Sequence, residues 1–438
     1  MTTGPSLAIR RIFGSLGFVV SGKAGAGLIS LAYMVIATRI LGPRDYGVLV
    51  LMHGFVITVC GIVSFPAWQG IVRYGAHAQT ENDTGRLARL LRFGAVVELG
   101  AGVLAIATII ILAPYFGPRL GWSGQALAFM PFYAFAALGA VRSTPAAYLQ
   151  LIHRFDLIGA HNLVAPLVRL GGSALVLLSG GGLQAFLVAW LVAGVAEWLS
   201  LWTIGYWFAR RDLGPELHLN ALKGVRDENP GIWRFLIASN GDITLSELTG
   251  RLAPLIVGWW LGPAAAGLFS VAQRVTVIIA QPAQILGNSS YAELARMVAA
   301  GHGGETLRRT LYGVIGIALA SVAPVLLLVM FFSTQLVTLM AGPAFVGASG
   351  VMVLLVLARA VAMIGPPCSS ALSAMGRPGL SVRSNLWASL TFLPLLPPMM
   401  HFWGLAGAGM QAIAQSVAAS AMLAVFTWRQ SHRTGAAQ

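Results

Sequence analysis

Charged residues are scarce in this chain. They make up 10% of its 438 residues, whereas a soluble domain carries about 25%. Among the charged residues the acidic ones are the fewer, with 14 Asp and Glu against 28 Lys and Arg. A water-soluble globular domain is therefore excluded. The 57% share of hydrophobic residues and the mean hydropathy of +0.77 predict a polytopic membrane protein, and the continuous, non-alternating apolar runs argue against a β-barrel.

Cysteine is also rare, and the one nucleotide-binding pattern is incomplete. The two cysteines lie in apolar runs, so the sequence offers no disulfide or metal framework. Residues 17–27, GFVVSGKAGAG, approach a phosphate-binding loop, but Ala24 stands where a hydroxyl would hold Mg²⁺. The stretch belongs to an apolar run, 15–37, whose one charge is Lys23, and therefore predicts a membrane helix. We predict no cofactor, no metal and no catalytic residue.

Twelve apolar runs are long enough to cross a membrane. With the N-terminus inside, the cytoplasmic loops hold 19 of the 28 basic residues and the opposite side holds three. Lys and Arg accumulate in cytoplasmic loops, so this bias predicts cytoplasmic N- and C-termini and explains the net charge of +14 without a nucleic-acid partner. The first run is expected to stay uncleaved. The predicted spans are 15–37, 46–72, 93–116, 125–147, 161–179, 183–208, 235–260, 266–290, 311–332, 348–370, 384–402 and 406–428.

The turn after the first span recurs in the second half of the chain. IATRILGPRDYG at 36–47 resembles IVGWWLGPAAAG at 256–267, an offset close to half of the chain length. The longest polar stretch, 210–234, lies near the midpoint. We therefore predict an all-α protein with an N-terminal six-helix bundle over 1–209, a cytoplasmic linker over 210–234 and a C-terminal six-helix bundle over 235–438. Six spans in each half give both bundles one orientation, which suits alternating access around a central cavity.

Ionisable residues inside the predicted spans indicate a candidate site. A charge at the bilayer centre costs about 2.5–3.5 kcal/mol on insertion scales, so an internal watery cavity explains ten such residues better than ten separate positions facing lipid. Cations outnumber anions among them by six to four. Arg142, close to a span end, is expected to reach the membrane surface. Because Arg and Lys bind phosphate oxygens, we predict a cationic cavity for an anionic head group such as a diphosphate, formed by Lys23, Arg251, Arg274, Arg169 and Arg359.

Polar residues on the seventh and eighth spans extend this candidate site. All but Asp242 recur at helical spacing along one face of each span, and Asp242 is expected at the same depth as Lys23. The two acids among them could neutralise the empty cavity or carry a proton, and an ion pair between Glu247 and Arg251 along the helix is an open alternative. The predicted polar and ion-coupling residues are Asp242, Glu247, Asn240, Gln281, Gln284 and Asn288.

Local motifs at both repeats resemble a known family. LGPRDYG at 41–47, preceded by TRI at 38–40, and GLFSVAQRV at 267–275 are similar to the polysaccharide flippases. These lipid-linked oligosaccharide translocases belong to the multidrug/oligosaccharidyl-lipid/polysaccharide (MOP) exporter superfamily. The resemblance implies a V-shaped pair of lobes, with the first, second, seventh and eighth spans lining the groove.

The resemblance also implies a function. The protein would move an isoprenoid diphosphate-linked oligosaccharide repeat unit from the cytoplasmic to the outer leaflet of a bacterial inner membrane. The product would enter O-antigen (lipopolysaccharide), capsule or exopolysaccharide biosynthesis. Membrane lipids and polysaccharide assembly proteins are the implied partners.

Three alternatives stay open. Peptidoglycan-precursor flippases of the same superfamily usually have fourteen spans, two more than we count. A multidrug antiporter would favour carboxylates, whereas cations prevail here. A membrane sugar polymerase or ligase would need a sizeable outer loop, which the predicted topology lacks.

Overall fold

The structure is a computed structural model that describes residues 5–64, 67–218, 224–274, 276, 296–297 and 304–436. The regular elements of the described part are all helices, and it holds no β-strand, which confirms the all-α prediction. It divides into two compact units. The first comprises Met1–Leu41 and Met52–Leu248, and the second comprises Gly42–Leu51 and Thr249–Gln438. The boundary that the sequence predicts at 210–234 stays a prediction.

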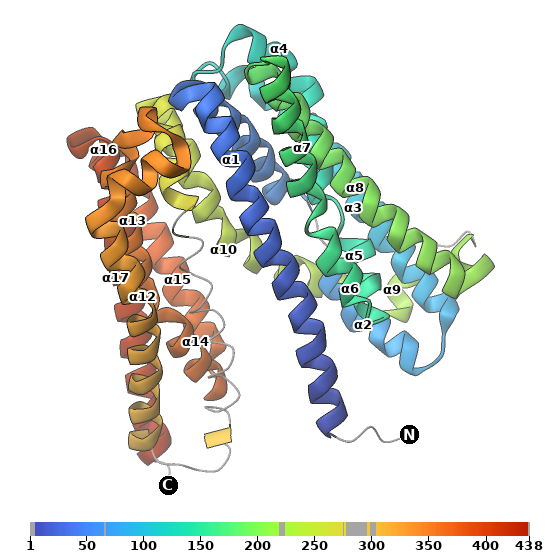
Figure 1. Ribbon diagram of the computed structural model, residues 1–438. Coiled ribbons are helices and arrows are strands. Elements are labelled where there is room, and N and C mark those ends of the chain that lie inside the picture. The colour runs from blue at the N-terminus through green and yellow to red at the C-terminus, as the bar shows by residue number, and fades with distance from the viewer. Residues whose placement is uncertain are drawn as a thin grey trace. The chain divides into compact units, whose positions relative to one another are not determined.

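Long apolar helices and shorter pieces make up the first unit (Figure 1). Its longest helices exceed the roughly 20 residues that cross a bilayer, and α7 and α8 pack against each other. The elements, in chain order, are α1 (Pro5–Val63), α2 (Trp68–Thr80), α3 (Thr84–Phe116), α4 (Gly124–Tyr133), the 3₁₀ turn η1 (Ala134–Ala140), α5 (Ser143–Leu151), α6 (Phe155–His161), α7 (Val164–Ser179), α8 (Leu183–Leu213), η2 (Gly214–His218), α9 (Val225–Glu228) and α10 (Ile232–Leu261). The Gly42–Leu51 part of α1 and the part of α10 from Thr249 onward belong to the second unit.

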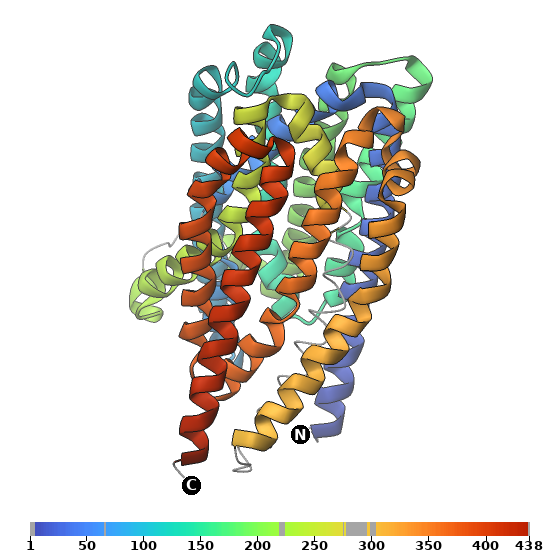
Figure 2. The same cartoon turned by 90° about the vertical axis from the view of Figure 1, so that its left-hand side faces the viewer.

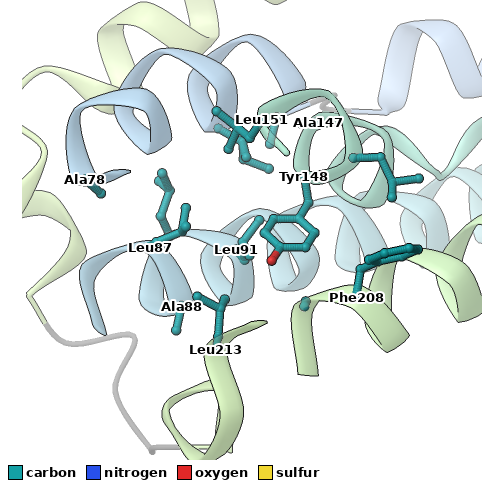
Figure 3. Close-up of a cluster of buried hydrophobic side chains, with 14 of the residues drawn as sticks. Ala78, Leu87, Ala88, Leu91, Ala147, Tyr148, Leu151, Phe208 and Leu213 are labelled. Atoms are coloured by element: carbon teal, nitrogen blue, oxygen red, sulfur yellow. The ribbon is translucent and has the colours of Figure 1, made fainter. Parts of the chain in front are cut away.

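A cluster of buried apolar side chains joins α2, α3, α5 and α8 at one end of the first unit (Figure 3). Leu87 and Leu91 of α3 lie against Leu151 of α5, and Phe208 comes from α8. Tyr148 lies in the same cluster and its hydroxyl donates a hydrogen bond of 3.0 Å to Asp212. The apolar contacts hold the short α2 and α5 against the two long helices.

The segment that leads into α10 is attached to this end of the first unit. The Glu228 carboxylate of α9 forms an ion pair of 2.7 Å with Arg89 of α3. The Tyr74 hydroxyl of α2 donates to the Pro230 carbonyl oxygen at 3.1 Å. The amide of Asn229 is buried and accepts from Arg86 through its oxygen. Polar contacts therefore fix the start of α10 on α2 and α3.

The fourth predicted span is a broken helix. It runs through α4 and η1, opens at Val141 and Arg142, and resumes as α5. The Trp202 indole donates to the Val141 carbonyl oxygen at 2.8 Å. Gly194 of α8 permits η1 to approach closely, because a Cβ there would lie 2.8 Å from a backbone oxygen of Ala136. Backbone outside regular helix at membrane depth is tolerated only when protein groups satisfy it, and Trp202 of α8 supplies the group that binds the Val141 carbonyl.

The second unit is a bundle in which α17 packs against α13, α15, α16 and α14 (Figures 1 and 2). A buried cluster that includes Leu307, Leu311, Cys368, Leu372 and Leu423 joins α12, α14 and α17. Beyond the segment 263–274, which is helical, the elements are α12 (Gly304–Ala341), η3 (Pro343–Ala348), α13 (Ser349–Ala362), α14 (Gly365–Ala374), α15 (Pro378–Phe392), η4 (Leu393–Leu395), α16 (Leu396–Trp403) and α17 (Leu405–Ala436).

The two copies of the sequence repeat meet inside the second unit. Gly42 and Gly262 both have positive φ, 66° and 87°, a conformation that favours glycine, and a proline follows each. A Cβ on Gly47 would collide with the carbonyl oxygen of Pro263, and a Cβ on Gly267 would collide with that of Pro43. The contact is reciprocal, so equivalent residues of the two copies face each other backbone to backbone.

Most of the predicted membrane spans coincide with helices, whereas 384–402 is interrupted by η4 and most of 266–290 lies outside the described residues. Eight segments of the described part are long and apolar enough to cross a membrane. The first, Gly22–Val63, contains two predicted spans, one on each side of the kink at Gly42. The element order is consistent with twelve helices in two sets of six.

Candidate functional site

A guanidinium without an acidic partner lies inside the first unit. Arg169 of α7 donates from Nη2 to Nε2 of His53 at 3.2 Å, and from Nη1 to the Tyr33 hydroxyl at 3.4 Å. Its Nε is buried and has no hydrogen-bond partner in the described part of the chain. No described carboxylate lies within ion-pair distance of it. The charge is therefore held by neutral groups alone.

Aromatic rings surround this arginine. The Arg169 Cζ lies 5.4 Å from the ring centroid of Trp190 and 5.9 Å from that of Tyr33, within the range of cation–π attraction. The two rings meet edge to face with centroids 5.2 Å apart. His53 in turn contacts the fully buried Tyr133, with 3.1 Å between Nδ1 and the phenol oxygen. We call Arg169, His53, Tyr33, Tyr133 and Trp190 the Arg169 cluster.

Four helices bring the cluster together. Tyr33 and His53 come from the two parts of α1, on either side of its kink at Gly42. Tyr133 ends α4 immediately before the 3₁₀ turn η1, and Trp190 lies on α8. Arg169 and His53 are half-buried, whereas the aromatic residues are buried. The cluster therefore presents a partly accessible cation on an ordered aromatic base.

The buried carboxylate of Glu98, also in the first unit, is fully hydrogen-bonded to backbone amides. Both carboxylate oxygens of Glu98, which is 2% exposed, accept from the backbone N–H groups of Ser143 and Thr144, the latter at 2.7 Å. Glu98 thus caps the N-terminus of α5, where a negative charge is favoured. These contacts are internal, so Glu98 stabilises the broken span and is not available to a ligand.

Arg142 takes part in the same arrangement. Its guanidinium pairs with Glu197 at 2.8 Å and donates to the Gly139 carbonyl oxygen at 2.7 Å. It also lies 3.2 Å from Nδ1 of His161, whose Nε2 is 2.9 Å from the Glu197 carbonyl oxygen. We call Glu98, Arg142, His161 and Glu197 the break network. Arg142 turns into the bundle, so the expectation that it extends to the membrane surface is wrong.

The remaining predicted cations have different environments. Lys23 on α1 is exposed, and it follows Gly22, which is packed against Gly159. Arg359 on α13 is half-buried, and its Nε is buried without a hydrogen-bond partner among the described residues. Arg251 on α10 and Arg274 are half-buried.

Part of the predicted polar set can be placed and part cannot. The buried Asn240 amide donates to the Leu236 carbonyl oxygen at 2.8 Å, while its Oδ1 has no partner within the described part. Asp242 and Glu247 belong to α10, but their side chains lie outside the description. Gln281, Gln284 and Asn288 lie outside the described residues. A shared cavity formed by the predicted set therefore remains a prediction.

The residues that hold Arg169 were not predicted from the sequence. Only Asp, Glu, Lys and Arg were treated as intramembrane ionisable groups, which left out His53, within the predicted span 46–72, and His161, at the start of 161–179. Histidine in an apolar run was the available signal, because an ionisable residue inside a membrane indicates a functional site by default.

Comparison with known proteins places the chain in a family. Residues 36–349 match the family model described as "Polysaccharide biosynthesis protein". The "Inner membrane protein YghQ" of Escherichia coli (strain K12) is 28% identical over 294 residues, which cover 66% of this chain and 82% of YghQ.

Solved structures share the fold. An inward-facing multidrug resistance MATE family transporter of the MOP superfamily superposes with a TM-score of 0.75 at 14% identity, covering 93% of this chain and 94% of its own. The lipid II flippase MurJ in an inward closed conformation superposes with a TM-score of 0.70 at 10% identity, covering 96% and 90%.

Proposed function

Because the chain belongs to the polysaccharide biosynthesis protein family and has the fold of MOP-superfamily membrane transporters, we propose that it is a flippase for a lipid-linked oligosaccharide. Its substrate would be an isoprenoid diphosphate-linked repeat unit, moved from the cytoplasmic to the outer leaflet of a bacterial inner membrane. O-antigen, capsule or exopolysaccharide would be the product of the pathway. The inner-membrane location draws support from the relative YghQ.

The uncompensated charge of Arg169 is the observation that carries this proposal. Removing a charge from water costs several kcal/mol unless a counter-charge or hydrogen bonds restore what is lost. The break network shows that this chain can pair its intramembrane charges, yet Arg169 has only neutral partners among the described residues. A diphosphate diester carries two negative charges and offers oxygens to the planar guanidinium fork. The buried Trp190 and Tyr33 rings beside it hold the guanidinium in position.

The wider site remains part of the proposal. Lys23, Arg251, Arg274 and Arg359 would add positive charge along the substrate path, and Asp242 or Glu247 would neutralise the empty path or carry a proton. Alternating access would follow from two like-oriented bundles, 1–209 and 235–438, joined by the segment 210–234, with both termini in the cytoplasm.

The test replaces Arg169 and follows the sidedness of the lipid intermediate. In cells in which Arg169→Ala is the sole copy, complete lipid-linked repeat units should accumulate and stay inaccessible to an impermeant sugar-oxidising reagent in spheroplasts. We expect the accessible fraction to fall at least tenfold, the equivalent of about 1.4 kcal/mol in substrate stabilisation. Arg429→Ala, at an exposed position of α17, is the matched control and should transport normally when expressed at the same level.

Other results would identify another activity or none. Accumulated peptidoglycan precursor would favour the peptidoglycan-precursor flippase, and drug sensitivity with normal polysaccharide would favour the multidrug antiporter. Single repeat units on the outer face would indicate a polymerase. Normal outward accessibility with Arg169→Ala would refute the role of this arginine.

A further inference from the structure

Arg359 lies at the midpoint of a broken span in the second unit. The candidate membrane span Pro343–Ala374 runs through η3, α13 and α14. It is interrupted between α13 and α14 at 363–364, and two consecutive prolines follow in the first turn of α14. Because proline has no N–H to donate, carbonyl oxygens of the preceding turn lose their helical partners there. We call 363–364 the second break and 141–142, in the fourth predicted span, the first break.

The second break corresponds to the first break. Val361 follows Val141 by 220 residues, the same offset that separates the two copies of the sequence repeat. In each case a long neighbouring helix donates a hydrogen bond to the carbonyl oxygen of this valine. Trp202 of α8 donates to Val141 at 2.8 Å, and the Ser420 hydroxyl of α17 donates to Val361 at 3.0 Å. The two spans are therefore held in the same way where their helices are interrupted.

The second unit lacks the acids that compensate charge near the first break. Glu98 and Glu197 lie there, whereas the residues 220 positions later are Ala318 and Val417. The acids of the second unit, none of which lies in a predicted membrane span, are Asp45, Glu293 and Glu305. An arginine at the second break therefore has no acid of its own unit at its depth.

The guanidinium of Arg359 is enclosed and uncompensated. Arg359 lies one turn before Ala362, the residue that follows Arg142 by the repeat offset, so both arginines lie on the same face of their spans. Its Nε is buried, and no hydrogen bond or ion pair joins its guanidinium to another described residue. Every residue of 351–370 is buried or half-buried. Because burial of an unpaired charge is costly, an anion from outside the chain would stabilise this side chain.

The depth of Arg359 indicates which anion can reach it. The hydrocarbon core of a bilayer is about 30 Å thick, so its midplane lies about 15 Å from either headgroup layer. A resident phospholipid keeps its phosphate in that layer, and the distance exceeds the length of an arginine side chain. A head group that crosses the membrane passes through the midplane, and a guanidinium binds phosphate oxygens through two parallel hydrogen bonds. The phosphate that fits Arg359 is therefore that of a translocated lipid.

We infer that Arg359 forms a binding site for the diphosphate of the lipid-linked substrate, and that this anion provides at the second break the counter-charge that Glu197 provides at the first break. The inference rests on the proposed function and deepens it, because it assigns a phosphate site to the unit that does not contain the Arg169 cluster. The charge at the second break is uncompensated without substrate and compensated with it. Substrate therefore stabilises the second unit when it binds.

The test measures binding of a lipid-linked diphosphate sugar. The probe is farnesyl diphospho-N-acetylglucosamine, and the full-length protein sits in phosphatidylcholine nanodiscs, which contain no anionic headgroup. Arg359→Met keeps the length of the side chain and removes its charge, so probe affinity should fall about tenfold or more, as expected for the loss of a charged hydrogen-bond donor. Arg377→Ala, at an exposed arginine between α14 and α15, is the matched control and should keep the wild-type affinity.

A stability measurement separates a ligand-binding charge from a structural one. Arg359→Met removes a charge that lacks a partner, so without probe it should unfold in dodecylmaltoside micelles at a higher content of sodium dodecyl sulfate than the wild type. Arg142→Met should unfold at a lower content, because Glu197 loses its partner. Saturating probe should raise the wild-type midpoint and raise that of Arg359→Met less. A loss of stability in Arg359→Met like that in Arg142→Met would overturn the inference.

Two further ligands identify the chemical group that Arg359 binds. Farnesyl N-acetylglucosaminide, which lacks the diphosphate, should bind equally weakly to the wild type and to Arg359→Met. Replacement of part of the phosphatidylcholine by phosphatidylglycerol should leave probe affinity unchanged. Competition by phosphatidylglycerol that disappears in Arg359→Met would assign the site to a resident phospholipid and overturn its assignment to the substrate.

The outcomes distinguish this inference from the proposed function. Wild-type affinity in Arg359→Met beside weakened binding in Arg169→Ala overturns the site in the second unit and leaves the flippase proposal intact. Failure of the wild-type protein to bind the probe overturns the proposed function, and the second site falls with it. Weaker binding and higher stability in Arg359→Met, beside an unchanged Arg377→Ala, support the inference.

Discussion

Adding one methyl group to Gly47 should destabilise the second unit measurably. The Cβ of Gly47→Ala would collide with the Pro263 carbonyl oxygen and would lie 3.1 Å from the backbone nitrogen of Gly267. Both obstacles are backbone atoms, so no side chain can rotate away. Overpacking costs about 1–3 kcal/mol, and glycine-to-alanine replacement within a helix regains about 1 kcal/mol. Since the collision is with rigid backbone, we expect the upper end of this range, a net loss of about 2 kcal/mol.

The control for this prediction is a glycine with free space. Gly316 of α12 is exposed, and nothing would lie within 4 Å of an added Cβ. Gly316→Ala should therefore stabilise the protein by about 0.4–1 kcal/mol. Unfolding free energies of both variants come from titration of dodecylmaltoside micelles with sodium dodecyl sulfate, followed by circular dichroism.

The prediction requires that Gly47→Ala lowers the free energy of unfolding and that Gly316→Ala raises it. Gly267→Ala, on the reciprocal side of the contact, should behave like Gly47→Ala. If Gly47→Ala and Gly267→Ala were both as stable as the wild type, the backbones of the two repeats could not be in contact, and the reciprocal crossing would be refuted.

The other predictions concern charges in the first unit. Glu98→Gln keeps one acceptor oxygen for the two amides that the carboxylate binds, so unfolding in mixed micelles should show a loss of about 1–3 kcal/mol. Arg142→Ala leaves Glu197 unpaired and should lower the free energy of unfolding by up to about 3 kcal/mol. Adding Glu197→Gln should restore part of this stability, because neutralising the acid removes the unpaired charge. Strict additivity of the two changes would contradict the pairing. Arg169→Lys keeps the charge but loses the planar fork, so probe affinity should fall below that of the wild type but less than in Arg169→Ala; wild-type affinity in Arg169→Lys would argue against bidentate binding.

The features that depend on residues close together in the sequence were predicted. Continuous apolar runs located the helices, because a membrane span needs its backbone hydrogen bonds satisfied within one segment. The repeat at Gly42 and Gly262 predicted matching turns, and both glycines have the positive φ that the Leu-Gly-Pro pattern indicates. The contact between the copies could not be predicted, since no local rule states which turns approach each other.

The broken fourth span shows where the sequence signal was weak. The run 125–147 is apolar throughout except for Arg142, so hydropathy alone indicated one continuous helix. A helix-start signal was nevertheless present in Ser143 and Thr144 followed by proline. The partner that caps this start, Glu98, lies 45 residues earlier in the chain, beyond any local pattern.

The sequence predicted which residue types lie inside the membrane spans, but it did not predict which groups surround each of them. Composition singled out Arg169 and Arg142 alike as intramembrane cations. Only the packing of the helices distinguishes them, because Arg142 meets the carboxylate of Glu197 whereas Arg169 meets a neutral imidazole and aromatic rings.

Glu98 also has a consequence for biogenesis. Ribosomes deliver α3 to the insertion machinery before Ser143 and Thr144, whose backbone N–H groups bind the carboxylate, have been synthesised. A carboxylate in mid-span then opposes partitioning by about 2.5–3.5 kcal/mol, and this penalty lasts until the later segment arrives. We therefore expect α3 to linger beside the translocon as a nascent chain, and a polypeptide truncated after Phe116 to integrate less completely than one that extends past α5.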